Sequence, residues 1–120
     1  MIDPMKFVRS VRFAVQGLAT LVRSENNARI HTLAMVLAVG AGLYFRIPAR
    51  DWLWLALAIT LVFTTEALNT ALEKLVDLVS PERRPLAGQI KDLAAGAVLI
   101  TALFALGVAW VVFGTYLSAE

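Results

Sequence analysis

The sequence predicts an all-α integral membrane protein, with three transmembrane helices and an N-terminal amphipathic helix that lies on the membrane surface. Of the 120 residues, 59% are hydrophobic, whereas a soluble domain is usually about 45–50% apolar. The apolar residues also come in long blocks, at 30–45, 52–65 and 93–117. With a mean hydropathy of +0.73, the chain is predicted to form a single membrane-embedded domain over residues 1–120.

Residues 5–23 have the pattern of an amphipathic surface helix. Lys6, Arg9 and Arg12 interrupt any long apolar run, so we do not expect a cleavable signal peptide here. At about 100° per residue, the basic residues share one side of the helix and the apolar residues share the other. A helix of this kind binds the interface of a membrane with anionic headgroups.

Three segments are predicted to cross the bilayer: 29–47, 52–79 and 92–117. A bilayer core needs roughly 20 helical residues, with about 17–25 observed. The third segment contains 25 consecutive residues without a charge. The first reaches this length if Arg29 and Arg46 extend their side chains to the polar boundary. The second continues into a cytoplasmic extension.

The basic residues predict the orientation in the membrane. Five of them precede or begin the first span, four lie within 74–91, and only two lie in the turn 46–51. Because basic loops stay on the cytoplasmic side, the N-terminus and the 74–91 segment are expected in the cytoplasm. Trp52 flanks the outer turn, and Trp110 and Tyr116 lie toward the outer end of the last span. This is where an aromatic belt is expected.

The second span carries a stripe of polar groups. The uncharged segment 52–65 runs directly into four polar positions that fall within an arc of about 80° on the helix surface. These positions are Glu66, Asn69, Glu73 and Asp77. An ionisable group in a bilayer costs about 2.5–3.5 kcal/mol even on the insertion scale. Three carboxylates on one face therefore indicate a functional site.

The predicted topology brings two other polar segments to the same face. Glu25 precedes the first span, and the loop 80–92 contains Arg83, Arg84 and Lys91. Carboxylates beside basic side chains suit a Mg²⁺–nucleotide site, because Mg²⁺ takes one or two carboxylates plus phosphate oxygens, and cations neutralise the remaining charge. The sequence contains no P-loop and no glycine-rich kinase loop. A nucleotide site in this chain would therefore be built on helices.

The order of these residues resembles that of a known family. The run Glu66-x-x-Asn69-Thr-Ala-x-Glu73-x-x-Val-Asp77, followed by Lys91-Asp92-Leu-Ala-Ala-Gly, is similar to the signature of the small prokaryotic diacylglycerol kinases and their undecaprenol kinase relatives. Glu25-Asn-Asn-Ala-Arg29-Ile-His31 fits the same pattern. The resemblance covers nearly the whole chain.

The resemblance implies a homotrimeric kinase of the bacterial inner membrane that transfers the γ-phosphate of MgATP to the hydroxyl of diacylglycerol, giving phosphatidic acid. It implies that Glu66 is the general base, that Asn69 orients groups in the site, and that Glu25 and Glu73 hold Mg²⁺. The residues implied at the ATP are Lys6, Glu25, Glu73, Glu82, Arg83, Arg84, Lys91 and Asp92. No nucleic-acid partner is implied. The chain departs from the family pattern at Glu82-Arg83-Arg84, where members commonly have an aromatic residue followed by His, and at Phe13, where some have Tyr.

Two alternatives stay open. Undecaprenol could replace diacylglycerol as the acceptor, since generic apolar side chains do not distinguish an acyl chain from an isoprenoid. The chain could instead be a non-enzymatic ion-conducting or structural oligomer that uses the acidic stripe as a cation path, which leaves Lys91 and Asp92 unexplained. Glu66 and Glu73 could also pair with cations of a neighbouring helix, and His31 is interpreted as an interfacial hydrogen-bonding residue.

Overall fold

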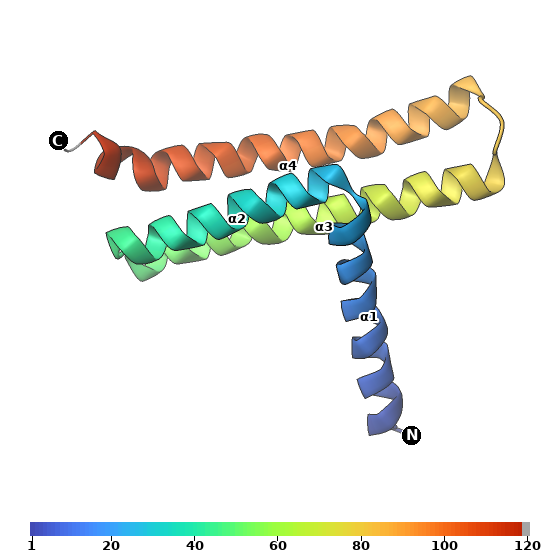
Figure 1. Ribbon diagram of the computed structural model, residues 1–120, viewed down its shortest axis with the longest axis horizontal. Coiled ribbons are helices and arrows are strands. Elements are labelled where there is room, and N and C mark those ends of the chain that lie inside the picture. The colour runs from blue at the N-terminus through green and yellow to red at the C-terminus, as the bar shows by residue number, and fades with distance from the viewer. Residues whose placement is uncertain (119–120) are drawn as a thin grey trace.

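The computed structural model describes residues 1–118, which form four α-helices and no strand. The helices are α1 (Pro4–Ser24), α2 (Asn26–Phe45), α3 (Ala49–Val79) and α4 (Pro85–Leu117). The last three lie side by side along the long axis of the molecule, whereas α1 points away from them (Figure 1). Each of these three is long and apolar enough to cross a membrane. The prediction of an all-helical protein with three helices able to span a membrane is confirmed.

Both ends of α1 are capped. At its start, Asp3 Oδ1 accepts hydrogen bonds from the backbone N–H groups two and three residues later, at 3.0 and 3.3 Å. Such donors have no partner within the helix. At its end, the guanidinium of Arg29 donates to the backbone carbonyls of Val22, at 3.1 Å, and Arg23. Arg29 therefore fixes the corner between α1 and α2, where a cation also interacts favourably with the helix dipole.

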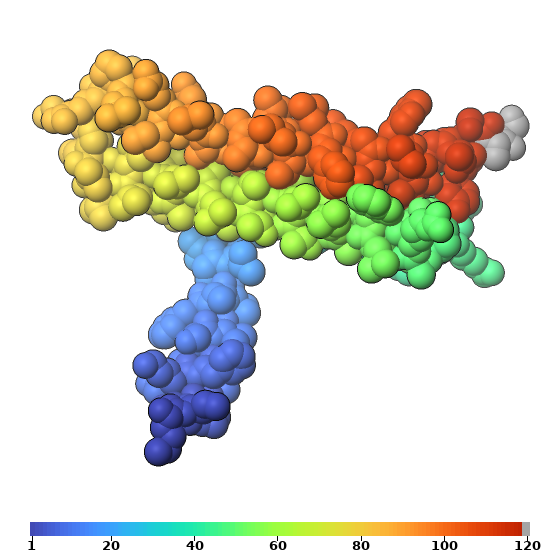
Figure 2. Space-filling model, turned by 180° about the vertical axis from the view of Figure 1, so that it is seen from behind, coloured from blue at the N-terminus to red at the C-terminus, as the bar shows by residue number. Residues whose placement is uncertain are grey.

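Most of α1 stands free of the other helices (Figure 2). Leu21, near its C-terminal end, is its only buried residue. The exposed side chains include large apolar groups such as Phe7, Val11 and Leu18. An apolar face of this extent indicates a surface that meets a partner or a membrane.

A left-handed residue closes the turn between α2 and α3. Arg46 has φ 54° and ψ 52°, and the N–H of Ile47 donates to the carbonyl of Gly42 at 3.2 Å. This is the pattern of a Schellman-type helix end, which is usually built on glycine. Because Arg46 leaves the helical conformation, α2 ends at Phe45, before the predicted span 29–47 does.

Gly42 makes a close contact within this turn. A Cβ at this position would lie 2.6 and 2.9 Å from ring atoms of Trp52 and 3.1 Å from Ile47 Cδ1. We expect Gly42→Ala to lower the free energy of unfolding by about 1–3 kcal/mol, because overpacking displaces side chains and backbone. Thermal denaturation in detergent measures this change. Gly40→Ala is the matched control, since a Cβ there meets nothing within 4 Å, and equal transition temperatures for the two variants would contradict the prediction.

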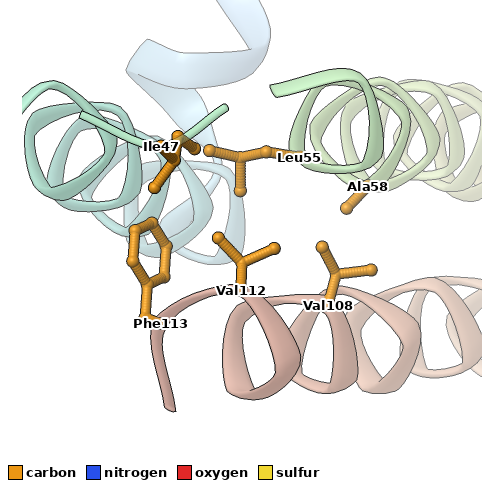
Figure 3. Close-up of a cluster of buried hydrophobic side chains, with 6 residues drawn as sticks. All are labelled: Ile47, Leu55, Ala58, Val108, Val112 and Phe113. Atoms are coloured by element: carbon orange, nitrogen blue, oxygen red, sulfur yellow. The ribbon is translucent and has the colours of Figure 1, made fainter. Parts of the chain in front are cut away.

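The apolar core lies between α3 and α4, at the end near the α2–α3 turn. It consists of Ile47, Leu55, Ala58, Val108, Val112 and Phe113 (Figure 3). Nearby, Phe45 of α2 stacks on Tyr116 with ring centroids 5.0 Å apart. Farther along the hairpin, the hydroxyls of Thr65 and Thr101 lie 2.9 Å apart and tie α3 to α4. The α3–α4 hairpin is the frame that carries the polar residues.

The helix lengths determine where the polar residues of α3 lie relative to α2. α2 has 20 residues, which makes it about 30 Å long and matches one bilayer core. α3 and α4 have 31 and 33 residues, or about 46 and 50 Å. The end of the hairpin that carries the loop 80–84 therefore extends well beyond α2 (Figure 1). The polar stripe of α3 lies where this extension begins.

Candidate active site

Three polar side chains of α3 are buried: Glu66, Asn69 and Thr70. They lie at i, i+3 and i+4, and so share one face of the helix. Glu66 is only 2% exposed. Burying a carboxylate is costly unless neighbouring groups compensate its charge. At Glu66 the predicted polar stripe faces the interior of the helix bundle, so neighbouring groups must compensate the charge of this carboxylate.

Three ionisable side chains lie near Glu66. Nε2 of His31, on α2, lies 3.2 Å from Glu66 Oε1. The ring is not aligned for a hydrogen bond, and Oε1 is buried without a hydrogen-bond partner, so this is a close polar contact. The charges of Glu25 and Glu73 also act on Glu66. The structure thus brings three predicted site residues together with His31.

Asn69 connects to the next carboxylate of the stripe. Its Nδ2 donates to Glu73 Oε1 at 3.2 Å, while its Oδ1 is buried without a partner. Buried acceptors in proteins normally have a donor. Asn69 Oδ1 is therefore an acceptor on this helix face that is available to a donor or a cation.

The other carboxylates near Glu66 suit a Mg²⁺ ion that is held partly by phosphate. Within residues 1–118, no group of three or more His, Cys, Asp or Glu side chains is arranged to hold a metal ion. Mg²⁺ in nucleotide sites needs only one or two carboxylates, because water and phosphate oxygens complete its shell. Glu25 and Glu73 are two carboxylates whose charges reach Glu66, and Asn69 holds Glu73. This donor set suits MgATP rather than an all-protein metal cage.

A second polar group lies toward the loop end of the hairpin. Lys91 Nζ and Asp77 Oδ1 form an ion pair at 2.6 Å between α4 and α3. The pair borders a cavity of about 670 Å³ beneath the loop 80–84. The other charged residues that line this cavity are Glu82, Arg83 and Arg84. Half of the residues predicted to contact ATP thus share this cavity, which lies about 16 Å along α3 from Glu66.

Two residues predicted at the nucleotide, Lys6 and Asp92, lie neither in this cavity nor among the ionisable groups that act on Glu66. Asp92 lines a shallow groove on α4 with Gln89 and Gly96, and not the cavity that contains Lys91, because adjacent helical residues point about 100° apart. Lys6 is exposed near the start of α1, the helix that leaves the bundle (Figure 1). One chain therefore does not assemble the whole predicted site.

An apolar groove of about 280 Å³ ends at His31. Its walls come from α2, α3 and α4, and the larger apolar side chains that line it are Ile30, Met35, Leu55, Ile59, Phe63 and Leu106. His31 is the one ionisable residue of its lining in the described part of the chain. The groove therefore meets the buried carboxylate through the imidazole of His31.

Comparison with known proteins decides the family. The sequence model of the family described as prokaryotic diacylglycerol kinase matches residues 12–113. The chain belongs to this family. It is 32% identical over 108 residues to the undecaprenol kinase of Bacillus subtilis (strain 168), across 90% of this chain and 88% of that protein. It is 41% identical over 97 residues to a diacylglycerol kinase of Synechocystis sp., across 80% and 55%. It is 29% identical over 100 residues to the diacylglycerol kinase of Escherichia coli (strain K12), across 83% and 82%.

Membership of the prokaryotic diacylglycerol kinase family confirms the predicted class of enzyme. This class is a lipid kinase, a phosphotransferase with an alcohol group as acceptor. The family also favours the enzyme over the non-enzymatic oligomer. Relatives named for two different acceptors match the chain, so the family alone does not select the lipid.

His31 is the residue at this site whose contact the sequence interpretation missed. It is the only residue of the apolar block 30–45 that can carry a positive charge, and an ionisable residue in a membrane span usually faces the interior of the bundle. This pattern predicts that His31 contacts another helix. Its partner depends on how α2 and α3 are aligned, which periodicity within one helix does not determine.

Proposed function

We propose that this protein transfers the γ-phosphate of MgATP to a lipid hydroxyl at the cytoplasmic face of the bacterial inner membrane. The observation that carries this proposal is the buried Glu66 carboxylate, which lies beside His31 and within reach of the charges of Glu25 and Glu73. In a lipid kinase, such a carboxylate is suited to accept the proton of the acceptor hydroxyl.

Glu66 acts as the general base. Its carboxylate accepts the hydroxyl proton as the lipid oxygen bonds to the γ-phosphorus, and the bond from that phosphorus to the β–γ bridging oxygen breaks to release ADP. Asn69 orients Glu73 through its 3.2 Å hydrogen bond and keeps Oδ1 free for a donor. Phosphoryl transfer depends mainly on alignment and charge neutralisation, which a small helical bundle can provide.

Glu25 and Glu73 hold the Mg²⁺ that accompanies ATP. When bound, Mg²⁺ neutralises charge on the phosphate oxygens. At the loop end of the hairpin, Lys91 exchanges its Asp77 partner for a phosphate oxygen, since both are charge-assisted contacts of similar strength. The further residues proposed at the nucleotide are Lys6, Glu82, Arg83, Arg84 and Asp92.

We place α1 on the cytoplasmic membrane surface, with the N-terminus in the cytoplasm. The helix leaves the bundle where α2 begins (Figure 1), at the level of the His31–Glu66 contact. Its exposed apolar side chains would enter the interface, and its basic residues would meet anionic headgroups. The basic segment 74–91 lies on the same side under the positive-inside rule. A lipid hydroxyl at headgroup depth is then level with Glu66.

A homotrimer would complete the site. Lys6 and Asp92 lie away from Glu66 within one chain, and α4 exposes large apolar side chains such as Leu93, Leu99 and Ile100. A neighbouring subunit could cover this surface of α4 and bring the missing polar groups to the carboxylate.

Mixed subunits test this arrangement. We expect Glu66→Gln and Asp92→Asn to be nearly inactive alone, and their co-expressed mixture to recover up to about a quarter of wild-type activity if each site draws these residues from different subunits of a symmetric oligomer. Activity of the mixture is measured after purification, with each single variant as a control. A mixture no more active than its components would show that both residues serve a site within one subunit.

Diacylglycerol is the proposed acceptor, and undecaprenol is the second candidate. The second candidate is favoured by the 32% identity to the Bacillus subtilis undecaprenol kinase over 90% of this chain. Purified protein in mixed micelles, with γ-labelled ATP, Mg²⁺ and either lipid, gives kcat/KM for each acceptor. A preference of tenfold or more, about 1.4 kcal/mol in transition-state binding, names the acceptor. The absence of transfer to either lipid by folded protein would contradict the proposed function.

A further inference from the structure

We infer that His31 is a positioning residue for Glu66, which holds Oε1 of the carboxylate so that Oε2 accepts the proton of the lipid hydroxyl. This inference rests on the proposed role of Glu66 as the general base. It gives His31 a part in the reaction beyond interfacial hydrogen bonding.

His31 places its Nε2 beside an oxygen that has no hydrogen-bond donor. Its Nε2 lies 3.2 Å from Glu66 Oε1, and the Glu66 side chain is 2% exposed while that of His31 is 22% exposed. Among the described residues, Oε1 has no hydrogen-bond partner. Catalytic hydrogen bonds are often poorly aligned without substrate and tighten in the substrate complex. A small rotation of the ring would convert this contact into a hydrogen bond.

The charges around Glu66 make such a donor necessary. Glu25 and Glu73 are negative, and both act on the Glu66 carboxylate, so they repel it. A glutamate side chain also has several rotatable bonds, whereas a general base must stay within about 2.6–3.2 Å of the proton that it accepts. Of the three ionisable neighbours of Glu66, only His31 carries an N–H donor, and its Nε2 lies 3.2 Å from Oε1. It therefore opposes the repulsion and fixes the direction of the carboxylate.

His31 also connects the carboxylate to the apolar groove. The groove of about 280 Å³ is lined by His31 together with apolar residues of three helices. The imidazole thus has an apolar surface on one side and Glu66 on the other. This placement lets one side chain contact both the groove and the carboxylate.

The test compares side chains that keep or remove the N–H at the position of Nε2. His31→Leu fills the space without a donor, His31→Gln places an amide N–H near the Nε2 position, and His31→Asn keeps an amide but is too short to reach Glu66. We expect kcat to fall about 10–100-fold in His31→Leu and His31→Asn, because small misplacements of a catalytic group cost about this much. His31→Gln should stay within about fivefold of wild type, and KM for ATP should change less than about twofold in all three variants.

Thr32→Val is the matched control. Its hydroxyl donates to Ala28 within α2 at 2.7 Å and has no part in the proposed site, so kcat should be unchanged. If Gln, Asn and Leu lower kcat equally in folded protein, His31 acts through packing and the inference is overturned. Wild-type kcat in all three variants overturns it as well. Should His31→Leu fail to fold, the contrast between Gln and Asn decides. An inactive wild-type protein would instead contradict the proposed function itself.

Discussion

Glu66→Gln is expected to lower kcat by about 10²–10⁴-fold, the contribution typical of a general base. The amide has nearly the shape of the carboxylate but cannot accept the hydroxyl proton. ATP binding, measured by displacement of a fluorescent nucleotide, should change by less than about twofold, because Glu66 is not among the residues proposed to bind the nucleotide. Steady-state rates in mixed micelles at saturating ATP and lipid measure the change in kcat.

Asp51→Asn is the control for this substitution. Asp51 lies in the first turn of the same helix, at the opposite end from the polar stripe. The same loss of one negative charge there should leave kcat unchanged. If Glu66→Gln retained a kcat close to that of wild type, Glu66 would be a structural residue of the bundle, and another group would have to accept the proton.

Glu73→Gln is expected to raise the Mg²⁺ concentration for half-maximal activity by about 10–100-fold, comparable to the loss caused by changing groups around a metal site. Glu73 is one of two carboxylates proposed to hold the ion, and the substitution removes its charge. A Mg²⁺ titration at fixed total ATP gives this value, and Glu25→Gln should behave similarly. With either substitution, high Mg²⁺ should restore part of the rate.

The Mg²⁺ titration also separates metal binding from base catalysis. Glu66→Gln should lower the maximal rate without a comparable shift in the Mg²⁺ midpoint. A midpoint that is identical in wild type, Glu25→Gln and Glu73→Gln would show that neither carboxylate holds the ion.

The helices could be predicted because their signals are local. The uncharged run 93–117 is visible within one segment, as is the opposition of basic and apolar sides along 5–23. The end of α2 was harder to predict, because Arg46 adopts a left-handed conformation that glycine more often provides. The direction of α1 also depends on a contact between two helices, because Arg29 of α2 donates to carbonyls at the end of α1.

The site could be predicted only in part, for a related reason. Helical spacing shows that Glu66, Asn69 and Glu73 share a face, and the structure joins Asn69 to Glu73. Helical spacing does not show that Asp77 pairs with Lys91 of α4 or that His31 contacts Glu66. Those contacts depend on the register between helices, which the turns and the core packing determine.

The most direct test of the central claim is the stoichiometry of transfer by the wild-type protein. Purified protein in mixed micelles is incubated with γ-labelled ATP, Mg²⁺ and the preferred acceptor lipid, and both ADP and label in the lipid phase are counted. We expect one labelled phosphate in lipid for each ADP formed, and rates of both products at least about 100-fold lower with Glu66→Gln. ADP without labelled lipid, or labelled lipid formed equally well by Glu66→Gln, would contradict it.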